Sequence, residues 1–192
     1  MSKVVEKGPG VWDVSDVVDA ESKFKEDATA KSADDKVKLD IKKDTVVKTK
    51  EGKPISLVTI TPMEEEPPAP PEGAHIIGLV YDIDVGKATF DELVTLTLTY
   101  DPALIPKGVS EEDLVLALWD EDTGEWVELP SIVNPETNTI SAEVTHLSKY
   151  AVFATTITPP EEEEEEVVEE APEGLARWIW VIIWLVIRHR AG

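Results

Sequence analysis

The chain has 192 residues, no cysteine, and 18 lysines and arginines against 40 acidic residues, which leaves a formal charge of −22. This balance excludes a nucleic-acid-binding protein that relies on a basic surface. Without cysteine the chain can form no disulfide, no thiolate metal site and no iron–sulfur cluster, and it has no cysteine nucleophile.

The charge is unevenly distributed along the chain. Residues 1–60 are neutral, with 12 lysines and 12 acidic residues. Residues 61–160 carry 3 lysines and 19 acidic residues, a balance of −16, and residues 161–192 carry 3 arginines and 9 glutamates, a balance of −6. The sequence therefore divides into a neutral first third and an acidic remainder that begins at Glu64.

Residues 1–22 are predicted to form an N-terminal arm. Residues 1–10 lack the apolar stretch of about 7–15 residues that a secretory signal requires. Residues 11–20 mix valine, tryptophan and aspartate without a clean period, which indicates an edge strand or a docked arm. Any export signal is therefore absent from this chain, and we expect the chain to be a fragment of a longer exported protein.

Residues 23–158 are predicted to form one all-β domain, an antiparallel β-sandwich. Turns rich in glycine, proline and aspartate separate the strands, and no helical period interrupts them. Alternating or continuous apolar residues mark eight strand segments, at residues 36–42, 55–61, 76–83, 94–100, 114–119, 126–129, 140–144 and 150–156.

Two segments within this domain have unusual composition. The connector 62–72 is rich in proline and glutamate, so it cannot form a packed helix or a central strand. We expect it to run extended over the surface and to join strands across the fold. Trp119 and Trp126 flank the acidic turn 120–124, which predicts a hairpin whose rings fill the core or, if they are partly exposed, bind a ligand.

Two turns place carboxylates two residues apart, Asp82 with Asp84 and Asp120 with Asp122. Oxygen ligands of this kind suit calcium. Neither turn supplies the later glutamate of an EF-hand loop, and Asp-Gly turns are ordinary in hairpins. We therefore expect solvated turns without metal or cofactor, with calcium at these four residues as the alternative.

His146 precedes Ser148 by two residues at the start of the last predicted strand. If a tight turn strains the Leu147–Ser148 peptide, His146 can take the Ser148 proton while Oγ attacks the Leu147 carbonyl. Water would then cleave the resulting ester. The alternative, which we favour, is an intact turn in which Ser148 satisfies a backbone group.

The His-Leu-Ser segment, followed by the strand 150–153, resembles the proteolysis-site motif of adhesion-receptor autoproteolysis-inducing domains. It is also similar to the motif of ankyrin- and netrin-receptor-type ZU sandwiches. Upstream, the segments 88–90, 96–102, 105–109 and 119–127 resemble a ZU-like module of prokaryotic surface proteins. The resemblance covers about residues 30–156 and implies an extracellular sandwich close to a C-terminal anchor.

The end of the chain combines an acidic spacer with a hydrophobic segment. Charge repulsion is expected to keep residues 159–174 extended and solvated. The apolar run 178–187 would span about 15 Å as a helix, roughly half of a hydrocarbon core, so a full span depends on snorkelling flanks. We predict a membrane anchor over 175–190, or alternatively a strand or helix docked on the sandwich or on another subunit. The anchor residues are Arg177, Trp178, Trp180, Trp184, Arg188 and Arg190.

These features predict a non-catalytic β-sandwich outside the cell, a stalk or adhesion module held at the membrane by its basic C-terminal end. Expected partners are the membrane and an unidentified protein or surface polymer, and no nucleic acid. One alternative is a sandwich that cleaves itself between Leu147 and Ser148. Another is a soluble assembly subunit whose hydrophobic end is buried by a neighbour.

Overall fold

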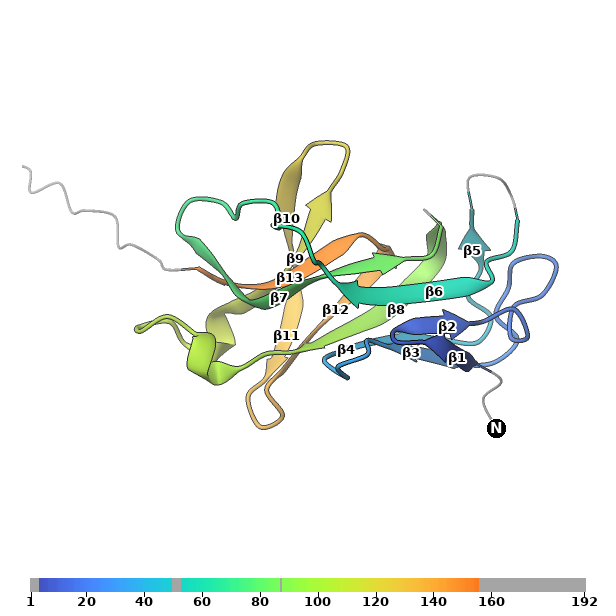
Figure 1. Ribbon diagram of the computed structural model, residues 1–192, viewed down its shortest axis with the longest axis horizontal. Helices are drawn as coiled ribbons and strands as arrows, with labels where there is room; N and C mark the ends of the chain where they lie inside the picture. Colours follow the sequence, from blue (N-terminus) through green and yellow to red (C-terminus); the bar gives the residue numbers. More distant parts are fainter. Residues whose placement is uncertain (1–3, 50–52, 87, 156–192) are drawn as a thin grey trace, which may run out of the picture. The chain divides into compact units, whose positions relative to one another are not determined.

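The computed structural model describes residues 4–49, 53–86 and 88–155, which form two antiparallel β-sheets (Figure 1). The all-β prediction is confirmed for this part of the chain. The predicted spacer 159–174 and hydrophobic segment 175–190, with its short helix, lie outside the described residues.

The first sheet has seven described strands, in the order β1-β2-β6-β7-β13-β9-β10. All neighbouring strands in it are antiparallel. Their bounds are β1 Val5–Gly8, β2 Val11–Asp13, β6 Leu57–Pro62, β7 Ala74–Asp84, β9 Leu114–Asp120, β10 Glu125–Leu129 and β13 Lys149–Thr155.

The second sheet has six described strands and is organised around β8. Strand β12 pairs along one edge of β8, and β4 and β5 share the other edge. The outer positions are taken by β11 and β3. The bounds are β3 Ala28–Lys31, β4 Val37–Ile41, β5 Val47–Lys48, β8 Thr89–Thr99, β11 Ser131–Asn134 and β12 Thr139–His146, and two short 3₁₀ turns, η1 Pro102–Leu104 and η2 Glu111–Asp113, follow β8.

One apolar core lies between the two sheets. Strand β8 shows why the sequence forms it: Val94, Leu96 and Leu98 are buried, whereas the threonines between them alternate to the other face. Strands β9 and β13 contribute Leu116 and Tyr150 from the opposite sheet. The two-residue period in the sequence therefore identified the inward-facing side chains of β8.

A second apolar cluster lies on the outer face of the first sheet. Residues of β9 and β13 that point away from the main core form it together with residues of β7 and β10. Its buried members are Ala74, Val80, Ala117, Trp126, Ala151 and Phe153. The tryptophan hairpin therefore contributes to an apolar core as predicted, with Trp126 buried and Trp119 partly buried, but this core is the second cluster and not the one between the sheets.

The proline-rich connector lies against this second cluster. The Trp126 indole Nε1–H donates to the Pro68 carbonyl oxygen at 3.2 Å, and the Met63 N–H donates to the Val80 carbonyl oxygen at 2.9 Å. The sequence led us to expect that the connector would cross the fold. It does not, because it joins β6 and β7, which are hydrogen-bonded neighbours. Its extended backbone supplies the acceptor that the buried indole requires.

The N-terminal residues are part of the sandwich. Strand β2 pairs with β6 inside the first sheet, and Val14, Val17 and Val18 belong to the main core. Several lysines of this neutral first third form ion pairs with aspartates of the same region. Five ion pairs join Lys7 to Asp13, Lys23 to Asp44, Lys31 to Asp35, Lys38 to Asp40 and Lys42 to Asp27.

All three tyrosines of the chain are buried and donate their hydroxyl protons. Tyr81 donates to Asp34 Oδ2 at 2.6 Å, Tyr100 to Glu111 Oε2 at 2.7 Å, and Tyr150 to the backbone oxygen of His146 at 2.6 Å. Burial and, in smaller part, the hydrogen-bonded carboxylate raise the pKa of Tyr81. The same two causes raise the pKa of Tyr100 to about 12. Burial alone raises the pKa of Tyr150.

We expect these tyrosines to resist ionisation in the native chain. Because their folded-state pKa values are raised, the stability they contribute is complete below the unfolded pKa of about 10 and is lost as the pH rises above it. The tyrosinate absorbance should therefore remain flat through about pH 10 and then rise together with the loss of β-sheet circular dichroism. In denaturant the same band should appear near pH 10. A native chain that ionises its tyrosines near pH 10 without unfolding would contradict this expectation.

Candidate functional site

The His146-Leu147-Ser148 segment forms the turn between β12 and β13. His146 is exposed, whereas Leu147 is partly buried and packs against the main core. The Ser148 hydroxyl donates to the Trp119 backbone oxygen at 2.9 Å, and the Ser148 backbone oxygen accepts from the Ile83 N–H at 3.0 Å. Ser148 thus ties the turn to β9 through its side chain and to β7 through its backbone.

Tyr150 holds the same turn from inside the core. Its ring is fully buried, and its hydroxyl reaches back four residues to the His146 backbone oxygen. None of residues 146–148 has positive φ, whereas four other non-glycine residues in the described part do. The backbone here therefore lacks left-handed strain, and the Ser148 hydroxyl proton is directed to a backbone oxygen. This geometry favours the intact turn over self-cleavage.

The four carboxylates considered as calcium ligands lie in or beside turns. Asp84 Oδ1 accepts from the Gly86 N–H at 2.7 Å, and Asp120 Oδ1 accepts from the Asp122 N–H at 2.8 Å. Asp82 lies opposite Lys149 in the β7–β13 ladder. Within 4–49, 53–86 and 88–155, no three histidine or acidic side chains gather as a candidate metal site.

The fold brings two of the predicted features together, the His-Leu-Ser turn and the acidic β9–β10 turn. Lys149 Nζ lies 2.9 Å from Glu121 Oε1. The pKa of the Asp120 carboxyl is lowered, chiefly by the Asp122 N–H, and in smaller part by Thr123 and by the charge of nearby His146. The stability that this carboxylate contributes is present above its unfolded pKa and is lost as the pH falls.

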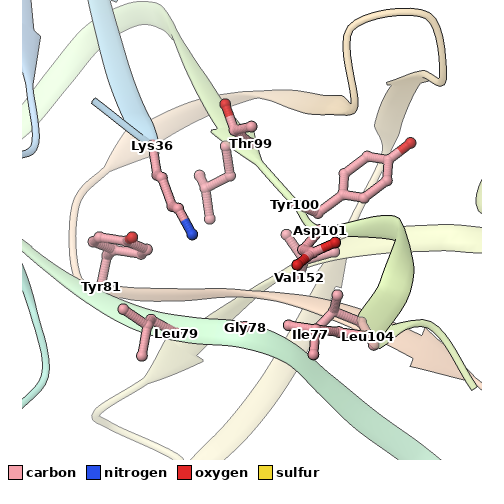
Figure 2. Close-up of a pocket in the computed structure, with 11 residues that line it drawn as sticks. Lys36, Ile77, Gly78, Leu79, Tyr81, Thr99, Tyr100, Asp101, Leu104 and Val152 are labelled. Carbon is pink, nitrogen blue, oxygen red and sulfur yellow. The ribbon is translucent and has the colours of Figure 1, made fainter. Parts of the chain in front are cut away.

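A small cavity between the two sheets was not predicted from the sequence (Figure 2). Ile77 and Val152 contribute to its apolar lining, and Figure 2 shows the Lys36 amine directed into it. The alternating pattern assigned Lys36 only to the outward face of a strand. A glycine at position 78 within an apolar strand, which is typical of a bulge or a close backbone approach, was the one available signal.

The residues assigned to the membrane anchor, Arg177 to Arg190, lie outside the described part of the chain. In the part that is described, no helix has the length and apolar character needed to cross a bilayer. No protein-family model matches the chain, and no curated protein is significantly similar to it. The resemblance to ZU-like modules therefore rests on the sequence motifs alone.

Proposed function

We propose that this chain is a non-catalytic β-sandwich module of the cell surface, which serves as a stalk or interaction domain in a larger exported protein. The supporting observation is that the described chain enters the sandwich at one end of its strands and leaves at the other (Figure 1). A domain with this connectivity adds its own length to a series of domains and holds its two neighbours in the chain apart.

The strand registers define this separation. Pairing through β2 and β6 places Val5 in the row of Leu57, just beyond the Asp84 end of β7. At the other end, Thr155 of β13 pairs with Ala74, the first residue of β7. Ten strand residues at about 3.3 Å each separate the two ends of β7, a distance of roughly 30 Å.

The composition of the C-terminal segments supports a membrane-proximal position. The acidic spacer 159–174 comes after the last strand, and the apolar, tryptophan-rich segment with basic ends comes after the spacer. An acidic domain and spacer are repelled by anionic lipid within about a Debye length of the surface. In this proposal the spacer keeps the sandwich away from the bilayer, where it is accessible to a partner.

Membrane attachment can be tested by carbonate extraction of membranes from cells that produce the full chain. We expect the chain to remain in the membrane pellet and a variant that lacks residues 175–190 to be released. A full-length chain that is released by carbonate and elutes as a soluble oligomer without detergent would instead favour the assembly-subunit alternative.

The non-catalytic assignment can be tested on a denaturing gel. After long incubation the purified full chain should remain a single band, because the Ser148 hydroxyl donates to the Trp119 backbone oxygen and no residue of the turn has positive φ. A fragment ending at Leu147, lost in Ser148→Ala, would establish self-cleavage. Ser131→Ala is the matched control, since the Ser131 hydroxyl also donates to a backbone oxygen, that of Leu129 at 2.7 Å.

A further inference from the structure

Strand β7 has an unpaired edge along half of its length. Strand β13 pairs with β7 from Ala74 to Asp82, whereas β6 pairs only with the last four residues, from Tyr81 to Asp84. After the bond between Met63 and Val80 the chain leaves β7 as the connector. Within the described part of the chain, no strand pairs with residues 75–79 on the β6 side, whereas on the other side β13 pairs with residues 74–77 and its register shifts before Tyr81.

This edge has no protective side chain, although the register of β7 with β13 shifts within it, between Ile77 and Tyr81. Residues 75–79 include no proline, lysine or acidic residue. Gly78 is exposed and has a φ of 83°, and a Cβ placed there would meet no atom within 4 Å. Another backbone can therefore approach Gly78 without a steric clash.

The cavity between the sheets lies beside this edge (Figure 2). Its lining includes Ile77, Gly78 and Leu79 from β7, and Leu104 from the turn after β8. Leu79 is 50% exposed and Leu104 is 53% exposed, so two aliphatic side chains border the cavity in contact with solvent. A third aliphatic side chain inserted here would remove apolar surface of both leucines from water.

Lys36 adds a charge preference to the cavity. Its amine points into the cavity in Figure 2, and in the described residues it has no ion-pair partner, unlike the five paired lysines of the same third of the chain. Asp101 also lines the cavity, but its Oδ1 accepts from the Ala103 N–H at 2.9 Å and it forms no ion pair with Lys36. A further carboxylate is the group complementary to Lys36. Since alternate residues of a strand lie on one face, an added strand would present an aliphatic and an acidic side chain together when they are two residues apart.

We propose that this edge binds an extended peptide segment of a partner protein. The segment adds as a strand along residues 75–79, places one aliphatic side chain between Leu79 and Leu104, and pairs a carboxylate two residues away with Lys36. Main-chain hydrogen bonds supply affinity in such strand addition, and the pocket for alternate side chains supplies specificity. The inference rests on the proposed interaction role and names the class of partner.

Binding can be measured with the full chain and a fluorescent synthetic peptide, Thr-Thr-Val-Thr-Glu-Thr. We expect saturable binding that Leu79→Glu weakens by about tenfold or more, as expected for loss of one aliphatic contact. A peptide with glutamine in place of glutamate should bind the wild type more weakly. Lys36→Gln should remove that difference between the two peptides, which a purely structural role of Lys36 would not do.

Matched controls separate the site from general effects of charge and folding. Leu93 is 51% exposed on β8, and Lys25 is an exposed lysine outside the cavity. Leu93→Glu and Lys25→Gln should leave peptide affinity within about twofold of the wild type. Peptide should also slow amide hydrogen exchange within residues 75–79, because added main-chain hydrogen bonds protect those amides.

Three results would overturn the proposal. The first is an absence of saturable peptide binding, and the second is binding that leaves exchange within residues 75–79 unchanged. The third is a dimer that Leu79→Glu dissociates, since the occupant would then be a second copy of the chain. A chain that is membrane-attached and binds no peptide would keep the proposed surface role and lose only this docking site.

Discussion

Gly10→Ala is expected to lower the free energy of unfolding by about 3–5 kcal/mol, a large share of the 5–15 kcal/mol typical of a domain. Gly10 has a φ of 70°, which an L-residue adopts at a cost of about 1–2 kcal/mol. A Cβ at this position would also lie 2.2 Å from the Ile60 backbone oxygen. Since that neighbour is backbone inside the first sheet, it cannot rotate away.

The clash would also disturb the junction between β2 and β6. The Ile60 N–H donates to the Gly10 carbonyl oxygen at 2.8 Å, and Ile60 is fully buried. Moving Gly10 away from Ile60 would therefore weaken this hydrogen bond and at the same time open the main core. Equilibrium denaturation followed by circular dichroism measures the loss directly.

Gly124→Ala is the matched control for Gly10→Ala. Gly124 has a φ of 71°, but a Cβ there would meet nothing within 4 Å. Gly124→Ala should therefore lower the free energy of unfolding by only about 1–2 kcal/mol, the cost of an L-residue at positive φ. Equal losses for the two variants would show that the contact with Ile60 contributes nothing beyond the backbone angle.

Trp126→Ala is expected to destabilise the domain by about 3–5 kcal/mol, the range for truncating a buried aromatic side chain. Trp126 is 9% exposed, and its ring meets Trp119 and Phe153 edge-on at centroid distances of 5.5 and 5.1 Å. Its indole also holds the connector through the Pro68 carbonyl oxygen. Protease cleavage within residues 63–73 should therefore become faster in this variant.

Two further substitutions on β10 separate the contribution of the indole hydrogen bond from that of the buried ring and provide a control at an exposed position. Trp126→Phe keeps an aromatic ring and loses the indole donor, so it should cost less, about 1–2 kcal/mol. Val127→Ala, at a 42% exposed position on the same strand, should change stability by less than about 1 kcal/mol. If Trp126→Ala were no more destabilising than Val127→Ala, the second apolar cluster would contribute nothing to the stability of the domain.

The strands with a strong two-residue pattern were predictable because burial of one face imposes that period on the sequence. The Val94, Leu96 and Leu98 series is the best case, and its side chains are buried as expected. Strands β1, β3, β5 and β11 were not predicted. The segment Ala28–Lys31 has little apolar character of its own, and its strand exists because β4 pairs with it over four residues.

The second apolar cluster shows a limit of pattern analysis. Strand β13 is buried on both faces, and a continuous apolar run does not reveal which element covers the second face. Here the proline-rich connector covers the second face. Its Pro68, whose carbonyl oxygen accepts from Trp126, lies 58 residues from Trp126 in the sequence. The proline content correctly excluded a packed helix or a central strand for this segment. It did not reveal where on the sandwich the segment docks.

The candidate site also has one part that the sequence predicted and another that it did not. The sequence located the His146-Leu147-Ser148 turn immediately before the last strand, which is where it lies. It did not show that the Ser148 hydroxyl would meet Trp119, 29 residues away. The cavity that contains Lys36 was also invisible, since it is formed by residues from five separate segments of the chain.

The sequence by itself determined the all-β class, most strand positions, and the division into a neutral first third and an acidic remainder. These features are local, since side-chain period and charge can be read within a short window. Only the tertiary structure decided which face each aromatic ring covers, which group receives the Ser148 proton, and which edge of β7 stays unpaired. Those outcomes depend on pairing between segments far apart in the chain, for which a local window contains no signal.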